Sequence, residues 1–115
     1  MSDDCLFCKI IAGEIPANKV FENDDLMAFH DINPAAPTHI LVIPKKHIAA
    51  VKSARQEDSG LLGELVLKAS EVARDQGLEA DGYRLVINTG NHGGQTVHHI
   101  HLHLLGGRHM TWPPG

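Results

Sequence analysis

The segment VHHIHLHLL, residues 97–105, constrains the fold more than any other part of the chain, because imidazole and aliphatic side chains alternate along it. Successive side chains of a β-strand point to opposite faces of the sheet. The alternation therefore predicts a strand over 97–105 with one polar face and one face that packs on a core. The polar face would carry His99, His101 and His103, and the core face Ile100, Leu102 and Leu104, beside His98 at the solvent-accessible start of the strand.

Three imidazoles on one strand face favour catalysis over a shared metal ion. Same-face neighbours on a strand lie about 6.5 to 7 Å apart, so His99 and His103 would be separated by roughly 13 Å at the backbone. Zinc–nitrogen bonds of about 2.0 to 2.1 Å allow two neighbouring imidazoles on one ion but disfavour three. A neutral imidazole is a good nucleophile toward phosphorus or acyl carbon. We therefore expect a catalytic row of histidines, with a solvent-exposed polar face as the alternative.

The loop NTGNHGGQT, residues 88–96, comes immediately before the histidines. Its paired glycines let backbone N–H groups turn toward an anion, and Gln95 and Thr96 add polar side chains. We expect this loop to hold a phosphate at the start of the histidine row. The alternative is a tight turn without a ligand.

Two short elements are predicted near the N-terminus. Apolar residues at i, i+4 spacing predict a helix over 6–12 that ends at Gly13. Asn and Asp tolerate turn conformations, so the run Asn23–Asp25 predicts the turn of a hairpin within 19–31.

Three further elements follow. The continuous apolar run HILVIP, 39–44, predicts a strand buried on both faces. From about Ser53, apolar residues every three or four positions predict a long helix that Gly77 ends, with Ser53 and Gln56 as a capping box. The segment GYRLVIN, 82–88, predicts another strand.

Size and charge narrow the possible classes of protein. The 115 residues, 43% of them hydrophobic, suffice for one core, so we expect a single domain over 1–115. Strands segregated from a few helices predict an α+β fold with a mainly antiparallel sheet. The formal net charge of −4 and the lack of a Lys/Arg run disfavour a nucleic acid polymer as partner. No apolar run approaches the roughly 20 residues of a spanning helix, and the N-terminus starts acidic, so we expect a cytoplasmic protein without a membrane partner.

Two long segments carry a resemblance to a known family. GGQTVHHIHLHLLGGR and AFHDINPAAPTHILVIPKKH together resemble the histidine-triad family, and the ending WPPG resembles its Hint branch. The resemblance extends from CLFCKIIAGEIPA to Gly115. It implies a five-stranded antiparallel sheet with one long and one short helix, in a homodimer whose two sheets join. The implied activity is that of a purine nucleoside phosphoramidase or related nucleotide hydrolase, which binds a purine nucleoside monophosphate or phosphoramidate.

The resemblance also assigns roles. His101 would attack the α-phosphorus, the amine would leave, and water would hydrolyse the nucleotidyl-histidine without a cofactor. His99 would set the geometry of His101, His103 would contact the phosphate, and His39 would support the charge network. On the phosphate side the resemblance implies contacts from Asn88, Gly94, Gln95 and Thr96, and at the ribose hydroxyls a contact from Asp31. An apolar slot for the purine would be formed by Leu6, Phe7, Ile10, Phe29 and Ile32. Trp112 would lie near the partner subunit's site, on the leaving-group side. The alternative for the five apolar residues is ordinary core packing without a purine. The alternative for Trp112 is a frayed C-terminus without a role at the site.

A C-x-x-C pair, Cys5 and Cys8, adds a possible metal site. In a reducing compartment such a pair more often means metal or redox chemistry than a disulfide framework. Resemblance to bacterial members that bind zinc implies His47 and His99 as the other ligands. Two thiolates and two imidazoles form a closed tetrahedral set, which favours a structural zinc. The alternative is two cysteines without a metal.

Two departures from the family pattern and two competing functions stay open. Thr96 stands where the family often has a serine, and its methyl group could crowd the amine; His98 replaces a more usual aromatic residue, which leaves the pH optimum open. The first competing function is a nucleotide-binding sensor or interaction module with vestigial turnover. The second, a zinc-dependent hydrolase with the histidine row as ligands, is disfavoured by the strand spacing.

Overall fold

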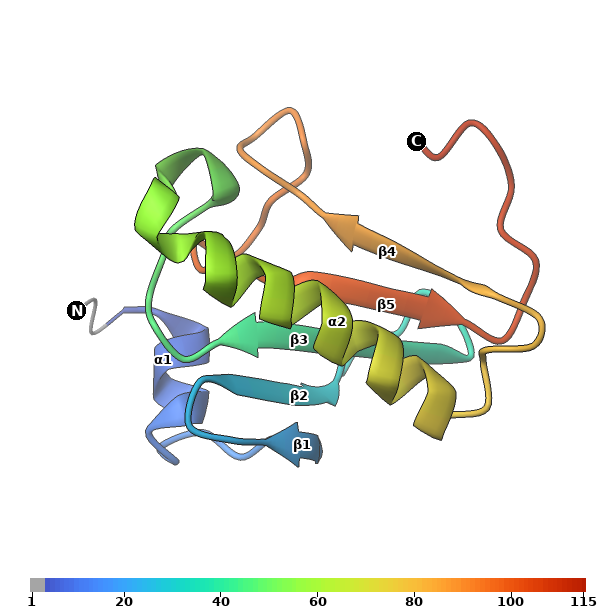
Figure 1. Cartoon of the computed structure of the whole chain (residues 1–115), viewed down its shortest axis with the longest axis horizontal. Helices are drawn as coiled ribbons and strands as arrows, with labels where there is room; N and C mark the ends of the chain where they lie inside the picture. Colours follow the sequence, from blue (N-terminus) through green and yellow to red (C-terminus); the bar gives the residue numbers. More distant parts are fainter. Residues whose placement is uncertain (1–3) are drawn as a thin grey trace.

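The structure is a computed structural model that describes residues 4–115. A five-stranded antiparallel sheet in the order β1-β2-β3-β5-β4 carries the long helix α2 across one face and the short helix α1 on the other (Figure 1). The predicted α+β architecture is confirmed. The elements are α1 (Leu6–Ile11), β1 (Lys19–Glu22), β2 (Leu26–His30), β3 (Thr38–Pro44), the 3₁₀ turns η1 (Val51–Ser53) and η2 (Gln56–Asp58), α2 (Ser59–Asp75), β4 (Tyr83–Ile87) and β5 (Leu102–Gly106).

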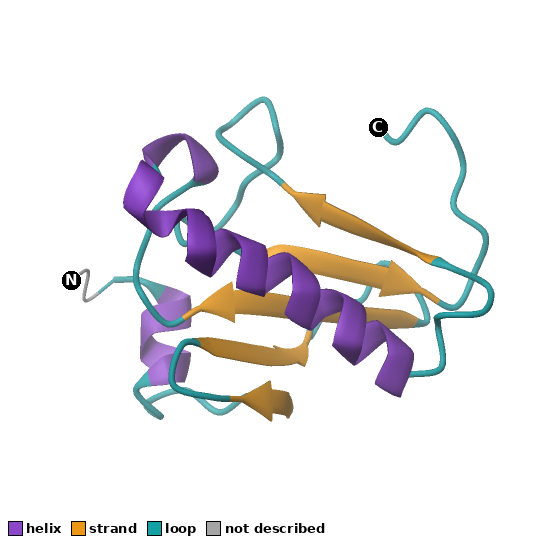
Figure 2. Cartoon of the chain, in the orientation of Figure 1, coloured by secondary structure: helices purple, strands orange, loops and turns teal. Residues whose placement is uncertain are grey.

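The central strand β3 separates two apolar clusters, as the sequence predicts for a strand buried on both faces. Ile40 and Val42 pack with α2, which buries Leu65 and Ala69 on that side. Leu41 and Ile43 face the other way and belong to the cluster that includes Phe7 and Ile10 of α1. Helix α1 therefore covers part of the sheet face opposite α2 (Figure 2).

The predicted hairpin and short helix are confirmed. Strands β1 and β2 pair antiparallel, and the Asn23 side chain accepts hydrogen bonds from the N–H groups of Asp25 (2.9 Å) and Leu26 (2.7 Å). Helix α1 ends just before Gly13, whose φ of 80° lies in the left-handed region. No helix of the described residues is long and apolar enough to cross a membrane.

The long helix begins later than predicted, at Ser59 instead of about Ser53. The capping box of Ser53 and Gln56 is wrong, because these residues end one 3₁₀ turn and begin another. The buried carboxylate of Asp58 organises the turn, since it accepts hydrogen bonds from the Arg55 N–H (2.9 Å) and the Lys46 ammonium (2.6 Å). The other end is as predicted, with Gly77 following the helix at a φ of 78°.

The strand predicted over 97–105 is wrong in its first half, since β5 begins at Leu102. Both neighbouring strands end their pairing at this residue, through Val42 on one side and Ile87 on the other. Upstream, the chain leaves the ladder, and the Ile100 N–H donates to the Ile48 carbonyl (2.8 Å). The division between faces survives this change: Ile100, Leu102 and Leu104 enter the α2-side core, His99 and His101 contact Phe7 on the other side, and His98 is exposed.

Candidate active site and metal centre

A cavity of about 470 Å³ lies on the α1 side of the sheet. Nine of the residues implied by the resemblance line it: Leu6, Phe7, Ile10, Phe29, Asp31, Ile32, Thr96, His101 and His103. Its lining thus combines an apolar part from α1 and β2 with a carboxylate and two imidazoles. Sequence reasoning missed the segment 15–18, which also lines it; the Pro16 that follows the helix end marks a turn but nothing local places it on the cavity.

His101 is held in one tautomer. Its Nδ1 lies 2.8 Å from the backbone carbonyl of His99, which can only accept, so Nδ1 carries the proton and donates. The lone pair of the neutral ring is therefore on Nε2. The ring is 5% exposed and packs edge-on against Phe7, with centroids 5.0 Å apart. An imidazole that holds its proton on Nδ1 presents the Nε2 lone pair that nucleophilic attack requires.

His39, His103 and Asp31 form a group beside His101. His39 Nε2 lies 2.9 Å from His103 Nδ1 and 3.4 Å from an Asp31 carboxylate oxygen. Burial lowers the pKa of His39, and burial together with the neighbouring His101 and His39 lowers the pKa of His103 to about 4. Both rings are thus neutral near pH 7. His103 Nε2 is buried and has no hydrogen-bond partner among the described residues, and an orphaned polar atom beside a cavity is suited to a ligand.

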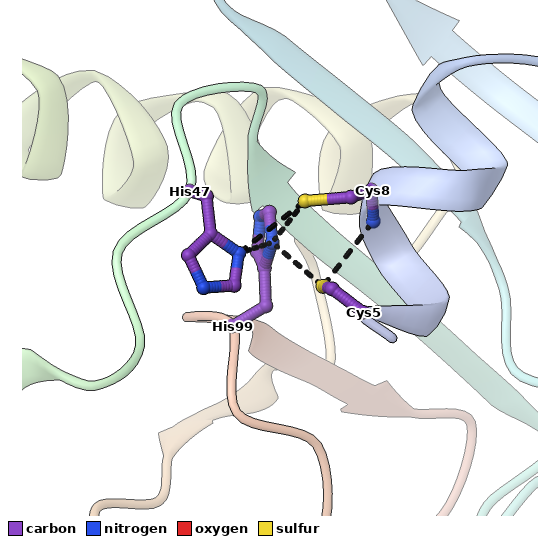
Figure 3. Close-up of side chains that lie close together, drawn as sticks. All are labelled: Cys5, Cys8, His47 and His99. Atoms are coloured by element: carbon purple, nitrogen blue, oxygen red, sulfur yellow. Dashed lines mark hydrogen bonds between the residues drawn. The ribbon is translucent and has the colours of Figure 1, made fainter. Parts of the chain in front are cut away.

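Four side chains from three distant parts of the chain converge at the amino end of α1 (Figure 3). His99 Nδ1 lies 3.1 Å from His47 Nδ1, 3.3 Å from Cys5 Sγ and 3.7 Å from Cys8 Sγ, and Cys8 Sγ lies 3.3 Å from His47 Nδ1. Zinc bond lengths in a tetrahedron give nitrogen–nitrogen and nitrogen–sulfur separations of about 3.4 and 3.6 Å. The four ligand atoms thus have the spacing of a closed tetrahedral site.

The surroundings of His99 and Cys8 also suit a metal. The imidazole of His99 donates from Nε2 to the Pro44 carbonyl (2.8 Å), which leaves the Nδ1 lone pair for the cluster; such an outer hydrogen bond is typical of metal-binding histidines. Burial and the neighbouring Cys5 raise the pKa of Cys8 to about 11, so the thiol is neutral without a cation. A bound zinc ion displaces such protons. The residues predicted as a metal site therefore fit one, and His99 reaches His101 through its backbone carbonyl instead of its ring.

Two residues predicted as phosphate contacts, Gly94 and Gln95, form hydrogen bonds within the protein in this structure. The Gly94 N–H donates to the Asn91 carbonyl (3.0 Å), so it is used within a turn. The Gln95 side chain is buried and binds only backbone: it accepts from the Gly90 N–H (2.9 Å) and donates to the Ala49 (2.7 Å) and Val97 (3.0 Å) carbonyls. The loop is therefore a tight turn that Gln95 fastens to the rest of the protein.

Of three more predicted residues, Asn88 and Trp112 do not line the cavity and Ile32 lies at its edge. Asn88 follows β4 and is half-buried. Trp112 is 80% exposed and near Arg84, whose guanidinium carbon lies 6.0 Å from its ring centroid. Ile32 lines the cavity but is 92% exposed, so it lies at the rim.

Comparison with known proteins places this geometry in a family. The family model described as the HIT domain matches residues 12–110. The chain is 56% identical to an uncharacterised HIT-like protein of Synechocystis, over the whole of both chains, and 53% identical to a 14 kDa zinc-binding protein of Zea mays, over 96% of this chain and 87% of that protein.

Solved structures agree. A HIT family hydrolase of Legionella pneumophila superposes with a TM-score of 0.96 at 58% identity, covering 97% of this chain and all of that one. A histidine triad nucleotide-binding protein of Candida albicans superposes with a TM-score of 0.75 at 34% identity, covering 96% and 83%. The family model spans the histidine row and all five strands of the sheet, and the chain belongs to the HIT family.

Proposed function

We propose that the protein is a hydrolase of purine nucleoside 5′-phosphoramidates, of the Hint type, that acts through a nucleotidyl-histidine at His101. The observation that carries this proposal is the hydrogen bond from His101 Nδ1 to the His99 carbonyl, which leaves a nucleophilic lone pair at the cavity. Membership of a family with a nucleotide-binding member and hydrolase members supports it.

The reaction runs in two displacements at phosphorus. In the first, His101 Nε2 forms a bond to the α-phosphorus while the P–N bond breaks and its electron pair leaves with the amine, which takes a proton from solvent. In the second, water forms the new P–O bond and loses a proton to solvent, the N–P bond breaks, and its electron pair returns to Nε2. The His99 carbonyl holds the Nδ1 proton throughout, which stabilises the cationic ring of the intermediate.

The residues that line the cavity suit the base, the ribose and the phosphate of a purine nucleotide in that order. Phe7 and Phe29, with ring centroids 5.7 Å apart, give an apolar slot for a base. Asp31 offers two carboxylate oxygens to the ribose hydroxyls, and the unpartnered Nε2 of His103 is available for a phosphate oxygen. The base, sugar and phosphate of one nucleotide thus have separate partners along one cavity.

The experiment that tests the proposal compares turnover of AMP-linked and GMP-linked amines by the wild type and His101→Asn. An asparagine keeps a donor for the His99 carbonyl but lacks the nucleophile, so we expect the rate to fall by about three orders of magnitude or more with nucleotide affinity largely kept. His98→Asn, at an exposed histidine, is the matched control. Equal rates in the wild type and His101→Asn would refute His101 as the nucleophile, and negligible turnover by both proteins would leave a binding module.

We also propose a structural zinc at Cys5, Cys8, His47 and His99. The ligand spacing and the zinc-binding relative of Zea mays support it. Zinc supplies no chemistry to the reaction there; it cross-links α1 to the segments that follow β3 and precede β5. Elemental analysis of untagged protein should find about one zinc per chain, and chelation should leave the turnover number at saturating substrate largely intact. Metal-free protein of normal stability would refute the site.

A homodimer joined through β4 completes the proposal. Among the described residues β4 pairs only with β5, so its other edge is open to a second copy. Leu67 on α2 and Trp112 in the tail are 61% and 80% exposed, and both suit an apolar interface. Sedimentation should give a dimer for the wild type and a monomer for Leu67→Asp. A wild type that is monomeric at micromolar concentrations would contradict this.

A further inference from the structure

The protonation of His39 is fixed by a backbone group outside the histidine row. The Ala35 N–H lies 3.0 Å from His39 Nδ1 and donates to it. A backbone N–H cannot accept, so Nδ1 must present a lone pair. The single proton of the neutral ring is therefore on Nε2.

The tautomer of His39 fixes the tautomer of His103. His39 Nε2 lies 2.9 Å from His103 Nδ1, and two N–H groups cannot face each other at hydrogen-bond distance. His39 therefore donates and His103 Nδ1 accepts, so that His103 carries its own proton on Nε2. The Asp31 carboxylate, 3.4 Å from His39 Nε2, can only accept and so supports the same assignment.

The assignment excludes a second metal at this group. Asp31, His39 and His103 bring ligand atoms within 4.8 Å of one another. A metal would need the lone pair of His39 Nε2, but that nitrogen holds the proton because Nδ1 is already an acceptor. The group is a hydrogen-bond relay and not a ligand set.

We propose that the Ala35 amide is a positioning group for the reaction: through His39 it makes His103 an obligate N–H donor to the cavity, which selects ligands with an acceptor oxygen at that place. The consequence is an opposed pair of imidazoles. His101 presents a lone pair at Nε2, whereas His103, with ring centroids 5.0 Å apart from it, presents an N–H. One ring can then attack phosphorus while the other binds a non-bridging oxygen of the same group. This inference rests on the proposed function for its ligand but not for its tautomers.

The loop that carries Ala35 is built to keep its amide in place. Pro34 and Pro37 flank it, and a proline ring fixes φ near −65°. The Arg108 guanidinium, just past β5, donates to the Ala35 carbonyl (3.1 Å). Arg108 is therefore a second positioning residue that acts through Ala35, and it lies outside the cavity.

The unmodified protein gives the first test. Long-range nitrogen-15 NMR correlations of labelled histidines, without ligand at pH 7, distinguish the two tautomers. We expect His39 and His103 with the proton on Nε2 and His101 with the proton on Nδ1. A His103 with its proton on Nδ1 would overturn the relay. Because no ligand is present, a failure of the phosphoramidase assay would refute the function without deciding this result.

The second test removes only the donor. Replacement of Ala35 by lactic acid turns the amide into an ester without an N–H, and Ala35→Gly is the control that keeps it. We expect the ester to let His103 populate the Nδ1–H tautomer and to weaken adenosine monophosphate binding about ten- to hundred-fold, the loss typical of a charge-assisted hydrogen bond. Arg108→Ala should shift both readouts in the same direction but less. An ester protein with the tautomers of the glycine control would overturn the proposal.

Discussion

Acid should destabilise the protein through His103, and the structure gives the size of the effect. Burial and two neighbouring imidazoles lower the pKa of His103 from 6.5 to about 4. The folded state thus disfavours the charged ring, whereas the unfolded chain takes up a proton below about pH 6.5. The stability that depends on neutral His103 is complete above that pH and is lost as the pH falls toward 4.

The magnitude follows from linkage. The difference of about 2.5 units, at about 1.36 kcal/mol per unit, corresponds to a loss of about 3 kcal/mol between pH 7 and pH 4. Other groups titrate in the same range, so the wild type must be compared with His103→Gln, which cannot titrate at this position. The cysteine cluster is the same in both proteins, so its acid sensitivity cancels.

Urea unfolding at pH 7, 5.5 and 4 measures the difference. We expect the free energy of unfolding of the wild type to fall by about 3 kcal/mol more than that of His103→Gln, mostly below pH 6. His98→Gln, at an exposed histidine, should follow the wild type. If the wild type and His103→Gln lose stability in parallel, His103 is not held neutral by its surroundings and the reasoning fails.

Three further predictions concern binding and selectivity. Cys8→Ser should abolish zinc retention and weaken nucleotide binding, because α1 carries Cys8 and also lines the cavity. Zinc added to metal-stripped wild type should restore nucleotide binding. An unchanged nucleotide affinity in Cys8→Ser would show that the metal site and the nucleotide site are independent. Asp31→Asn should weaken adenosine monophosphate binding about tenfold but spare 2′,3′-dideoxyadenosine monophosphate, while Asp24→Asn, an exposed acid on the hairpin, should change neither; equal losses for both nucleotides would argue against a ribose contact. Deletion of residues 110–115 should change selectivity among amines more than nucleotide affinity, and the truncated protein with unaltered selectivity would exclude a leaving-group role for the tail.

Local patterns predict much of the fold and part of the site. The alternation of Ile100, Leu102 and Leu104 with histidines is enough to divide the two faces, and the continuous run of β3 is enough to place it at the centre. Family resemblance adds the residues of the cavity, nine of which line it. The division of faces and the central strand follow from periodicity because each depends on residues close together in the chain, whereas the cavity residues lie far apart and come from the resemblance alone.

The sequence predicts less well those features that depend on contacts with residues far away in the chain. Strand β5 begins only at Leu102, because the segment before it bonds to Ile48 instead of continuing the ladder. Helix α2 begins at Ser59, because Lys46 and Arg55 hold the carboxylate of Asp58. Gln95 has the residue type of a phosphate ligand, but its side-chain amide donates to the Ala49 and Val97 carbonyls and accepts from the Gly90 N–H.

The sequence by itself predicts the candidate catalytic side chains and determines which sheet face they share, since alternation and periodicity are properties of neighbouring residues. Only the tertiary structure decides their protonation. The proton of His101 is set by a carbonyl two residues away in a non-strand segment, and that of His103 by the amide of Ala35 through His39. A tautomer depends on the direction of each hydrogen bond, and those directions exist only once distant parts of the chain have packed together.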